Sequence, residues 1–300
     1  GTHMEVFHAA VRAVTEQFAE GGETENLLNL LPGFVSPADL RLLKEIMTDF
    51  GQETVVLPDI SETLDGPALR EYEMIPRGGT KIADIRRLGR AGATIEFGRL
   101  LPEQHSAGAW LEKRFGVVRK ALGLPIGLRE SDRFFTLLEE LTGCPLPAKY
   151  AGERGRLIDA CVDGHKYVSG KKAIIYGEED LVVGLTSFLA EIGIQPVLCA
   201  SGGKSGRLAE AVREVSGDIL LEQPLVCGGV DFHEIALQAE VLAPDLVIGH
   251  SKGYPLAKKL SIPLVRVGFP IHDRLGGQRL LHLGYRGAQQ LFDLIANGLI

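Results

Sequence analysis

The sequence has few cysteines and no cysteine motif. Its 300 residues include Cys144, Cys161, Cys199 and Cys227, which form neither a CxxC pair nor any zinc-ligand spacing. Scattered free cysteines of this kind behave as small apolar side chains. They predict reduced thiols in a cytoplasmic protein and no metal ligands among them.

Long apolar runs and an excess of basic charge are also absent. No apolar run approaches the roughly 18 residues that a membrane-spanning helix needs, and no basic segment precedes a short apolar one. The formal net charge is −7, which disfavours binding to nucleic acid or to anionic membranes. We expect neither a membrane nor a nucleic acid as a partner.

Nucleotide-binding motifs are missing as well. The segment SGGKSG at 201–206 resembles a phosphate loop, but Leu198 stands where the motif needs its first glycine. No GxGxxG follows any predicted strand, and RGGTK at 77–81 is at most a weak anion site. Both glycine-rich segments are interpreted as turns.

What the sequence does contain is a regular alternation of short apolar runs and amphipathic segments. Such alternation with short connections predicts parallel sheets covered by helices. Strands are expected at 26–34, 53–58, 93–98, 171–177, 194–200, 218–222, 244–250 and 262–270. Helices are expected at 5–20, 36–51, 82–89, 131–143, 147–170, 178–193, 204–215, 231–243, 253–261 and 284–300. The clearest is 36–51, where Ser36 can cap the helix, Pro37 suits its first position and Gly51 can end it.

This pattern predicts an α/β fold with two Rossmann-like parallel-sheet domains, a helical segment joining them and a C-terminal helix. The first four residues, Gly1 to Met4, resemble a cloning scar. The expected divisions are 5–126 for the first Rossmann-like domain, 127–167 for the connecting helices, 168–274 for the second domain and 275–300 for the returning C-terminal segment.

Isolated histidines give little support for a metal or catalytic site. Cys161 and His165 lie four residues apart on one predicted helix, but two ligands do not make a site. His105, His233 and His250 each stand alone and are interpreted as surface or hydrogen-bonding residues. Ser251 follows His250 without a GxSxG motif, so hydrolase chemistry is not indicated.

Two segments, GHSKGY at 249–254 and GFPIHDR at 268–274, end predicted strands where ligands bind in open α/β sheets. They could form a reaction centre, or they could make polar contacts within the chain, to a helix end or to a neighbouring subunit. We favour contacts and assign no catalytic, cofactor-binding or metal-ligating residue. The contact candidates are His250, Ser251, Lys252, His272, Asp273 and Arg274.

Several longer segments resemble the nitrogenase component 1 superfamily, and in particular its β-type subunits. They run in order along nearly the whole chain: LLPGFVSPADLRLLKEIMTDFG, VVLPDISETLDGP, GGTKIADIRRLG, LPIGLRESDRFFTLLEELTG, ERGRLIDACVDGHKYVSGKKAIIYG, GHSKGYPLAKKLSIPLVRVGFPIHDR and GYRG. The chain is similar to two types of β subunit. One belongs to the scaffold on which the iron–molybdenum cofactor is assembled (NifN type), and the other belongs to the dinitrogenase itself (NifK type). The segments GGTKIADIRRLGRAGATIEFG and HDRLGGQRLLHLGYRG look more like the scaffold.

The resemblance implies an α2β2 complex with an α-type subunit of the same family, supplied with electrons by the reductase Fe protein. Such a complex would hold an iron–sulfur cluster and a precursor of the iron–molybdenum cofactor. The family's N-terminal cluster-binding domain is expected to be missing here, so this fragment should contribute architecture and subunit contacts.

In the α-type paralogue of the dinitrogenase, a histidine ligand of the cofactor occupies the strand-end segment. The corresponding position falls at Arg274, whose guanidinium cannot ligate a metal. The dinitrogenase β subunit, which takes part in reducing dinitrogen to ammonia, stays open as an alternative. So does a free-standing two-domain module that binds a small molecule.

Overall fold

A computed structural model describes residues 3–74 and 77–300, which form two compact units. The first unit comprises the described residues up to 122 together with 137–145 and 278–280, and the second comprises 123–136, 146–277 and 281–300. Gly1 and Thr2 of the expected scar lie outside the described residues. His3 and Met4 are the first residues of helix α1.

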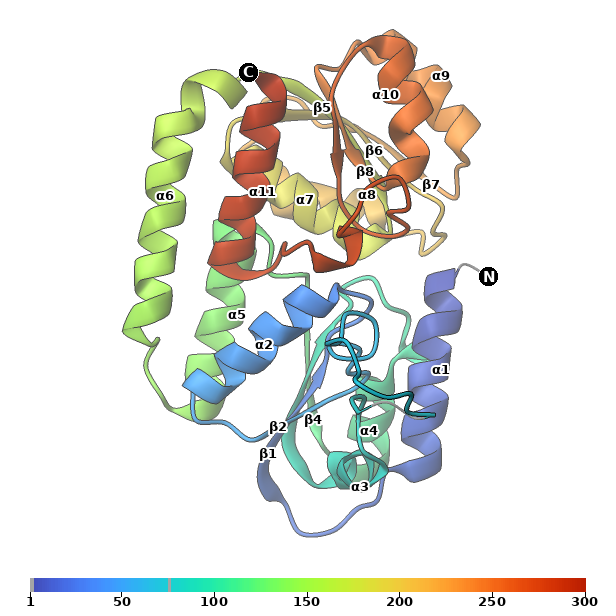
Figure 1. The fold of residues 1–300 in the computed structure, drawn as a ribbon, viewed down its shortest axis with the longest axis vertical. Helices are drawn as coiled ribbons and strands as arrows, with labels where there is room; N and C mark the ends of the chain where they lie inside the picture. The colour runs from blue at the N-terminus through green and yellow to red at the C-terminus, as the bar shows by residue number, and fades with distance from the viewer. Residues whose placement is uncertain (1–2, 75–76) are drawn as a thin grey trace. The chain divides into compact units, whose positions relative to one another are not determined.

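The first unit is built on a four-stranded parallel sheet of order β2-β1-β3-β4. Its strands are β1 (Glu25–Leu31), β2 (Thr54–Val56), β3 (Ala91–Phe97) and β4 (Val118–Leu122). The helices are α1 (His3–Phe18), α2 (Pro37–Asp49), α3 (Ile82–Arg86) and α4 (Ala107–Phe115), with the 3-10 turns η1 (Arg87–Arg90) and η2 (Glu103–His105). In Figure 1, α2 lies on one side of this sheet and α1, α3 and α4 lie on the other.

Burial on both faces explains why the strands are apolar throughout. Leu27 and Leu31 of β1 join a core with Leu88 and Leu111, while Leu28 and Leu30 are buried on the opposite face. The predicted start of α2 is confirmed: the Ser36 hydroxyl accepts the Asp39 N–H, and the Asp39 carboxylate accepts the Ser36 N–H in return.

The second unit is built on a five-stranded parallel sheet of order β7-β6-β5-β8-β9. Its strands are β5 (Lys172–Gly177), β6 (Gln195–Ser201), β7 (Leu225–Gly228), β8 (Leu246–Gly249) and β9 (Leu264–Arg266). Its helices are α6 (Ala148–Val168), α7 (Glu179–Glu191), α8 (Leu208–Ser216), α9 (Phe232–Leu242), α10 (Tyr254–Leu260) and α11 (Gly284–Leu299), with the 3-10 turn η3 (Ser251–Gly253). The 3-10 turn η4 (Gly277–Arg279) belongs to the first unit except for Gly277.

Helices cover both faces of this sheet. Helices α7 and α8 lie on one side and α9 and α10 on the other, and the C-terminal helix α11 packs along α6 (Figure 1). Helix α5 (Gly127–Thr142) begins in the second unit and ends in the first. The predicted fold class of two parallel-sheet α/β domains with a C-terminal helix is therefore confirmed. In the described part of the chain, no helix combines the length and apolar character needed to cross a membrane.

One predicted strand is wrong, and one helix and one strand were not predicted. Residues 218–222 are not a strand: the N–H groups of Ile219 and Leu220 bond back to the Ser216 carbonyl, and Leu221 is fully exposed. The strand follows at 225–228 instead. A helix and a strand at 107–122 were not expected, because β4 is an edge strand with the mixed sequence VRKAL, whose residues are only partly buried.

A partly buried carboxylate joins α7 to the start of α5. Glu191 accepts the N–H groups of Leu128 (2.7 Å) and Arg129 (2.9 Å). Burial raises the pKa of Glu191 to about 7, from an ordinary 4.5, although the two backbone hydrogen bonds oppose the rise. The folded protein therefore holds this proton more tightly than the unfolded chain does. The contribution of Glu191 to stability is then greatest below pH 4.5 and is lost as the pH rises toward 7.

We expect Glu191→Gln to remove this pH dependence. Between pH 5 and 7 the wild type should lose about 2 kcal/mol of unfolding free energy that the variant keeps. Urea denaturation at a series of pH values measures the difference. Glu210→Gln, at an exposed position of α8, is the matched control and should follow the wild type. If the unfolding free energy of Glu191→Gln changes with pH as steeply as that of the wild type, Glu191 does not titrate in this range.

Candidate functional site

Each sheet has one point where the chain reverses its direction of strand addition, and ligands bind at such points in open α/β sheets. In the first unit the reversal lies between β1 and β3, and in the second between β5 and β8. The carboxyl ends of these strand pairs are the candidate sites. Each is described within its own unit.

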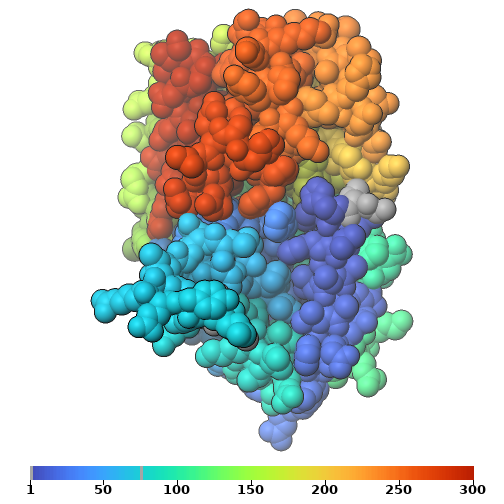
Figure 2. Space-filling view, turned by 45° about the vertical axis from the view of Figure 1, so that its right-hand side comes forward, coloured from blue at the N-terminus to red at the C-terminus, as the bar shows by residue number. Residues whose placement is uncertain are grey.

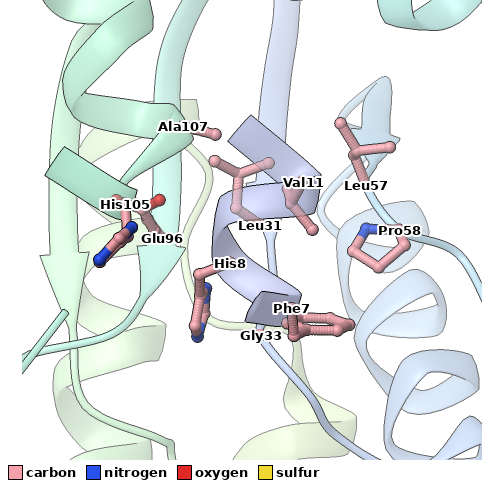
Figure 3. A pocket seen from close by; sticks show the side chains of 10 residues that line it. All are labelled: Phe7, His8, Val11, Leu31, Gly33, Leu57, Pro58, Glu96, His105 and Ala107. Carbon is pink, nitrogen blue, oxygen red and sulfur yellow. The ribbon is translucent and has the colours of Figure 1, made fainter. Parts of the chain in front are cut away.

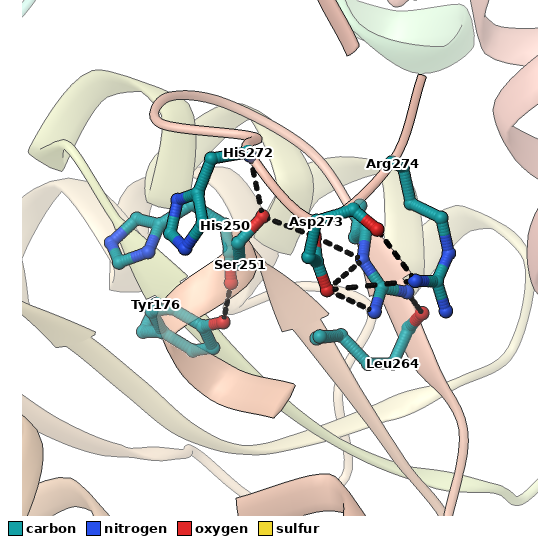
Figure 4. Close-up of polar contacts among 8 residues, drawn as sticks. Tyr176, His250, Ser251, Leu264, His272, Asp273 and Arg274 are labelled. Atoms are coloured by element: carbon teal, nitrogen blue, oxygen red, sulfur yellow. Dashed lines mark hydrogen bonds and ion pairs between the residues drawn. The ribbon is translucent and has the colours of Figure 1, made fainter. Parts of the chain in front are cut away.

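At the end of β5, Tyr176 is buried and donates its hydroxyl hydrogen to the His250 carbonyl (Figure 4). Its ring meets the His250 imidazole edge-on, with ring centroids 4.9 Å apart. Burial raises the pKa of the Tyr176 hydroxyl, so it stays protonated. Gly249 and Gly253 pack directly against this side chain, which leaves no room there for a Cβ atom.

Asp273 forms the centre of a polar clamp beside this tyrosine (Figure 4). Arg266 of β9 donates to both carboxylate oxygens, from Nε to Oδ1 (2.9 Å) and from Nη2 to Oδ2 (2.6 Å). Ser251 donates its hydroxyl hydrogen to Oδ1 and accepts the His272 N–H at 3.0 Å. The Arg266 hydrogen bonds, followed by that of Ser251, hold the pKa of Asp273 well below its usual range.

The remaining candidates lie around the clamp. Arg274 donates from Nη1 to the Asp273 carbonyl (2.7 Å) and is otherwise exposed, as is the His272 side chain. Lys252 is exposed in η3. The structure thus brings His250, Ser251, His272, Asp273 and Arg274 together and leaves Lys252 at their edge.

This arrangement is suited to holding a loop in place. The Ser251 hydroxyl points its hydrogen at a carboxylate that Arg266 keeps ionised, so Asp273 has little tendency to take the proton as a base would. The guanidinium already donates to both carboxylate oxygens. The charges of Arg266 and Asp273 therefore neutralise each other, while Lys252 and Arg274 stay exposed.

Glu178 occupies the position at which dinucleotide-binding folds place a phosphate, the start of the helix after the first strand. Its carboxylate accepts the Leu181 N–H at 3.1 Å and so caps α7. Burial raises the pKa of Glu178 to about 8. The neighbouring SGGKSG segment begins with the last residue of β6 and continues as an irregular loop, in which Ser205 donates its hydroxyl hydrogen to Glu179 (2.9 Å). The Glu179 carboxylate, which accepts hydrogen bonds from Ser205 of this loop, disfavours a bound phosphate there.

The reversal point of the first unit holds a small pocket, with a volume of about 230 Å³ that includes open solvent (Figure 3). It lies at the ends of β1, β2 and β3, and α1 contributes one wall. The lining residues are Phe7, His8, Val11, Leu31, Gly33, Leu57, Pro58, Glu96, His105 and Ala107.

Glu96 is the buried charge of this pocket. Its carboxylate accepts from Arg119 Nε (2.5 Å), from the Ser106 hydroxyl (2.5 Å) and from the Gly108 N–H (3.2 Å) at the start of α4. His8 lies across the pocket, and burial lowers its pKa although Glu96 opposes the shift. The pocket therefore presents a neutral imidazole beside a carboxylate whose hydrogen bonds are already made.

Sequence reasoning missed Tyr176 and Arg266 at the second site, and His8 and Glu96 at the first. Arg266 could have been suspected, because an arginine in the middle of an apolar strand needs a buried partner. His8 and Glu96 offered no such signal, since 88 residues separate them along the chain. His105 was expected to be isolated, but it lines the same pocket.

The described residues do not fit the metal clusters of the resembled family. Across 3–74 and 77–300, no group of three or more His, Cys, Asp or Glu side chains is placed to hold a metal ion. A thiol binds metal as the thiolate, yet burial raises the pKa of Cys161 to about 11 and that of Cys199 to about 12. We therefore assign no cluster ligand to these residues.

The whole chain, residues 1–300, matches the family model described as nitrogenase component 1 type oxidoreductase. The nitrogenase molybdenum-iron protein beta chain of Clostridium pasteurianum is 33% identical over 298 residues, which are 99% of this chain and 65% of that one. The nitrogenase iron-molybdenum cofactor biosynthesis protein NifN of Bradyrhizobium diazoefficiens is 33% identical over 280 residues, or 93% of this chain and 57% of that one.

Solved structures similar to this chain point to the same family. A chain of nitrogenase Cp1 at pH 6.5 superposes with a TM-score of 0.95 at 33% identity, covering 100% of this chain and 65% of that one. A chain of nitrogenase Cp1 at pH 5 shares the fold, with a TM-score of 0.68 at 12% identity. The present chain thus spans about two thirds or less of the length of the relatives that it matches. With a family model, relatives and a solved structure all matching along its length, the chain belongs to the nitrogenase component 1 type oxidoreductase family.

Proposed function

We propose that this chain is part of a β-type subunit of a nitrogenase-like complex, and that the complex is the scaffold on which the iron–molybdenum cofactor is assembled. The observation that carries the subunit assignment is the match of nearly the whole chain to proteins named as beta chains and as NifN. An α-type subunit of the same family would complete an α2β2 assembly in the cytoplasm. The reductase Fe protein would supply its electrons.

The choice of the scaffold rests on two segments, 78–98 and 272–287, which resemble the scaffold subunit more than the dinitrogenase subunit. The identity to NifN is 33%, which lies within the 30–34% range of the nitrogenase beta chains and therefore does not separate the two types. The alternative is therefore the β subunit of the dinitrogenase, which the several molybdenum-iron, vanadium-iron and iron-iron beta chains among the relatives favour.

Within such a complex, these residues would supply architecture and subunit contacts. This part of the proposal is supported by the two strand-end sites, where Glu96 and Asp273 have their hydrogen bonds satisfied by the chain's own groups. The iron–sulfur cluster and the cofactor precursor would be held by other parts of the assembly. Arg274, at the position of a cofactor ligand in the resembled α-type paralogue, is in contact with its own backbone neighbour.

Co-expression of the whole protein with the α-type subunit of its source organism tests the proposal. A scaffold complex should pass its cofactor precursor, after maturation, to cofactor-free dinitrogenase and activate it, without reducing dinitrogen itself. Reduction of dinitrogen to ammonia by the complex and Fe protein would establish the dinitrogenase alternative instead. Failure to form any complex with the α-type subunit would refute the subunit assignment.

A further inference from the structure

A long irregular connection joins β2 to α3 in the first unit, and we call its residues 59–74 and 77–80 the arm. The described part of the arm contains no helix or strand. Its base is held by ion pairs: Asp59 with Lys44 (2.8 Å), and Asp65 with Arg41 (2.7 Å). Connections of this length without secondary structure are uncommon in compact domains and usually have a function.

The outer part of the arm exposes large apolar side chains. Tyr72 is 89% exposed and Met74 is 83% exposed, and Leu64 and Leu69 are about half exposed. In Figure 2 the cyan segment that carries them stands out from the surface of the first unit. Exposed apolar side chains gathered on one segment are typical of a protein-binding surface, because leaving them in water is unfavourable. The base is thus fixed while the outer part lacks a covering surface within the described contacts.

We propose that the arm docks onto a different protein chain, the α-type subunit, with Tyr72 and Met74 as its principal contacts. This inference rests on the proposed function, which supplies the partner. Arginine, tyrosine and methionine are the residue types enriched at protein interfaces, and Arg70 stands beside the two apolar anchors.

The charge of the arm favours a protein partner over a nucleic acid or an anionic membrane. Beyond Asp65, whose charge is paired with Arg41, Arg70 and Arg77 are balanced by Glu71 and Glu73, so residues 66–74 and 77 carry no net charge. A nucleic acid or an anionic membrane would require an excess of arginine and lysine. An uncharged, partly aromatic segment is complementary to an apolar groove on another protein.

The available area argues against pairing between two copies of this chain. Burying the four apolar side chains of one arm against another would remove on the order of 600 Å² from each copy. A stable interface buries about 800 Å² on each partner. The area buried by pairing two arms is therefore too small for a stable interface. An arm that forms one part of a larger contact with a different subunit does not need to bury the whole area by itself.

The test uses the full chain with the α-type subunit of its source organism. We expect the double variant Tyr72→Ser, Met74→Ser to weaken the association at least about 30-fold, as loss of an aromatic anchor does. The matched control is Leu221→Ser, Val241→Ser, which removes apolar side chains that are 100% and 81% exposed, after α8 and on α9, and should bind as the wild type does. Because every substituted side chain is exposed, all variants should keep the wild-type melting temperature.

Limited trypsin digestion gives a second measurement that needs no variant. Arg70 and Arg77 are exposed and should be cleaved in the free chain and protected in the complex. Wild-type affinity of the arm variant, or continued cleavage at both arginines in the complex, would overturn the inference and leave the proposed function standing. A homodimer that the arm variant abolishes would overturn the choice of partner. If the wild-type chain forms no complex with the α-type subunit, the proposed function itself fails.

Discussion

Replacing Gly253 by alanine is expected to lower the free energy of unfolding by about 3 kcal/mol, as overpacking of a closely packed core does. Gly253 has a φ of −77°, which alanine adopts without strain, so the backbone itself permits the change. The obstacle is Tyr176: a Cβ at Gly253 would overlap its hydroxyl oxygen and lie 2.8 Å from Cζ. Tyr176 is buried and bonded to the His250 carbonyl, so it cannot move aside.

A second substitution isolates this cause. Tyr176→Phe removes the overlapping oxygen, and alone it should cost about 1 kcal/mol through the lost hydrogen bond. The variant with both changes should be more stable than the sum of the two single effects predicts, by about 1–2 kcal/mol. Gly155→Ala on α6, where a new Cβ meets no atom within 4 Å, is the control and should be neutral or slightly stabilising. Strict additivity of Gly253→Ala and Tyr176→Phe in urea denaturation would refute the steric account.

Asp273→Ala is expected to destabilise the protein by about 2 kcal/mol at neutral pH, because it leaves the Arg266 guanidinium without its carboxylate. Arg266 is only 12% exposed, so water replaces the lost partner incompletely. The pKa of Asp273 is lowered in the folded protein, which means that its stabilising effect is complete above the ordinary value of 3.8. The effect is lost as the pH falls below that value, toward the lowered pKa.

The wild type and Asp273→Ala should therefore differ most in stability at neutral pH and converge in strong acid. Asp218→Ala provides the matched control, because Asp218 pairs with Arg129 at 3.1 Å but is two-thirds exposed. Exposed pairs of this kind contribute little, so this variant should resemble the wild type. Thermal unfolding at a series of pH values measures both. Equal effects of the two substitutions would show that the Asp273 clamp is no stronger than a surface ion pair.

The sequence predicts most of the fold because its local signals agree with the final structure. Apolar runs buried on both faces identify the central strands, and Ser36, Pro37 and Gly51 mark the limits of α2. The errors arise where these signals are weak. Strand β4 lies at a sheet edge and carries charged residues, while residues 218–222 are apolar but form a turn after α8.

The candidate sites were less predictable than the fold, because the residues that contact one another at each site come from distant parts of the chain. The strand-end residues from His250 to Arg274 could be selected by position alone, since carboxyl ends of parallel strands meet at one edge. Their contacts to Tyr176 depend on strand order, which the sequence does not reveal. The same holds for the pocket in the first unit, where α1 brings His8 toward Glu96.

We propose that these residues provide architecture within the complex and that its cluster ligands lie elsewhere in the assembly. The most direct test is the iron content of the purified 300-residue chain after anaerobic reconstitution with ferrous iron and sulfide. We predict well under one iron atom per chain and no visible charge-transfer absorption, because no described group of side chains is placed to hold a metal and the buried thiols resist ionisation. Stoichiometric iron with a brown charge-transfer band would show instead that these residues hold a cluster themselves.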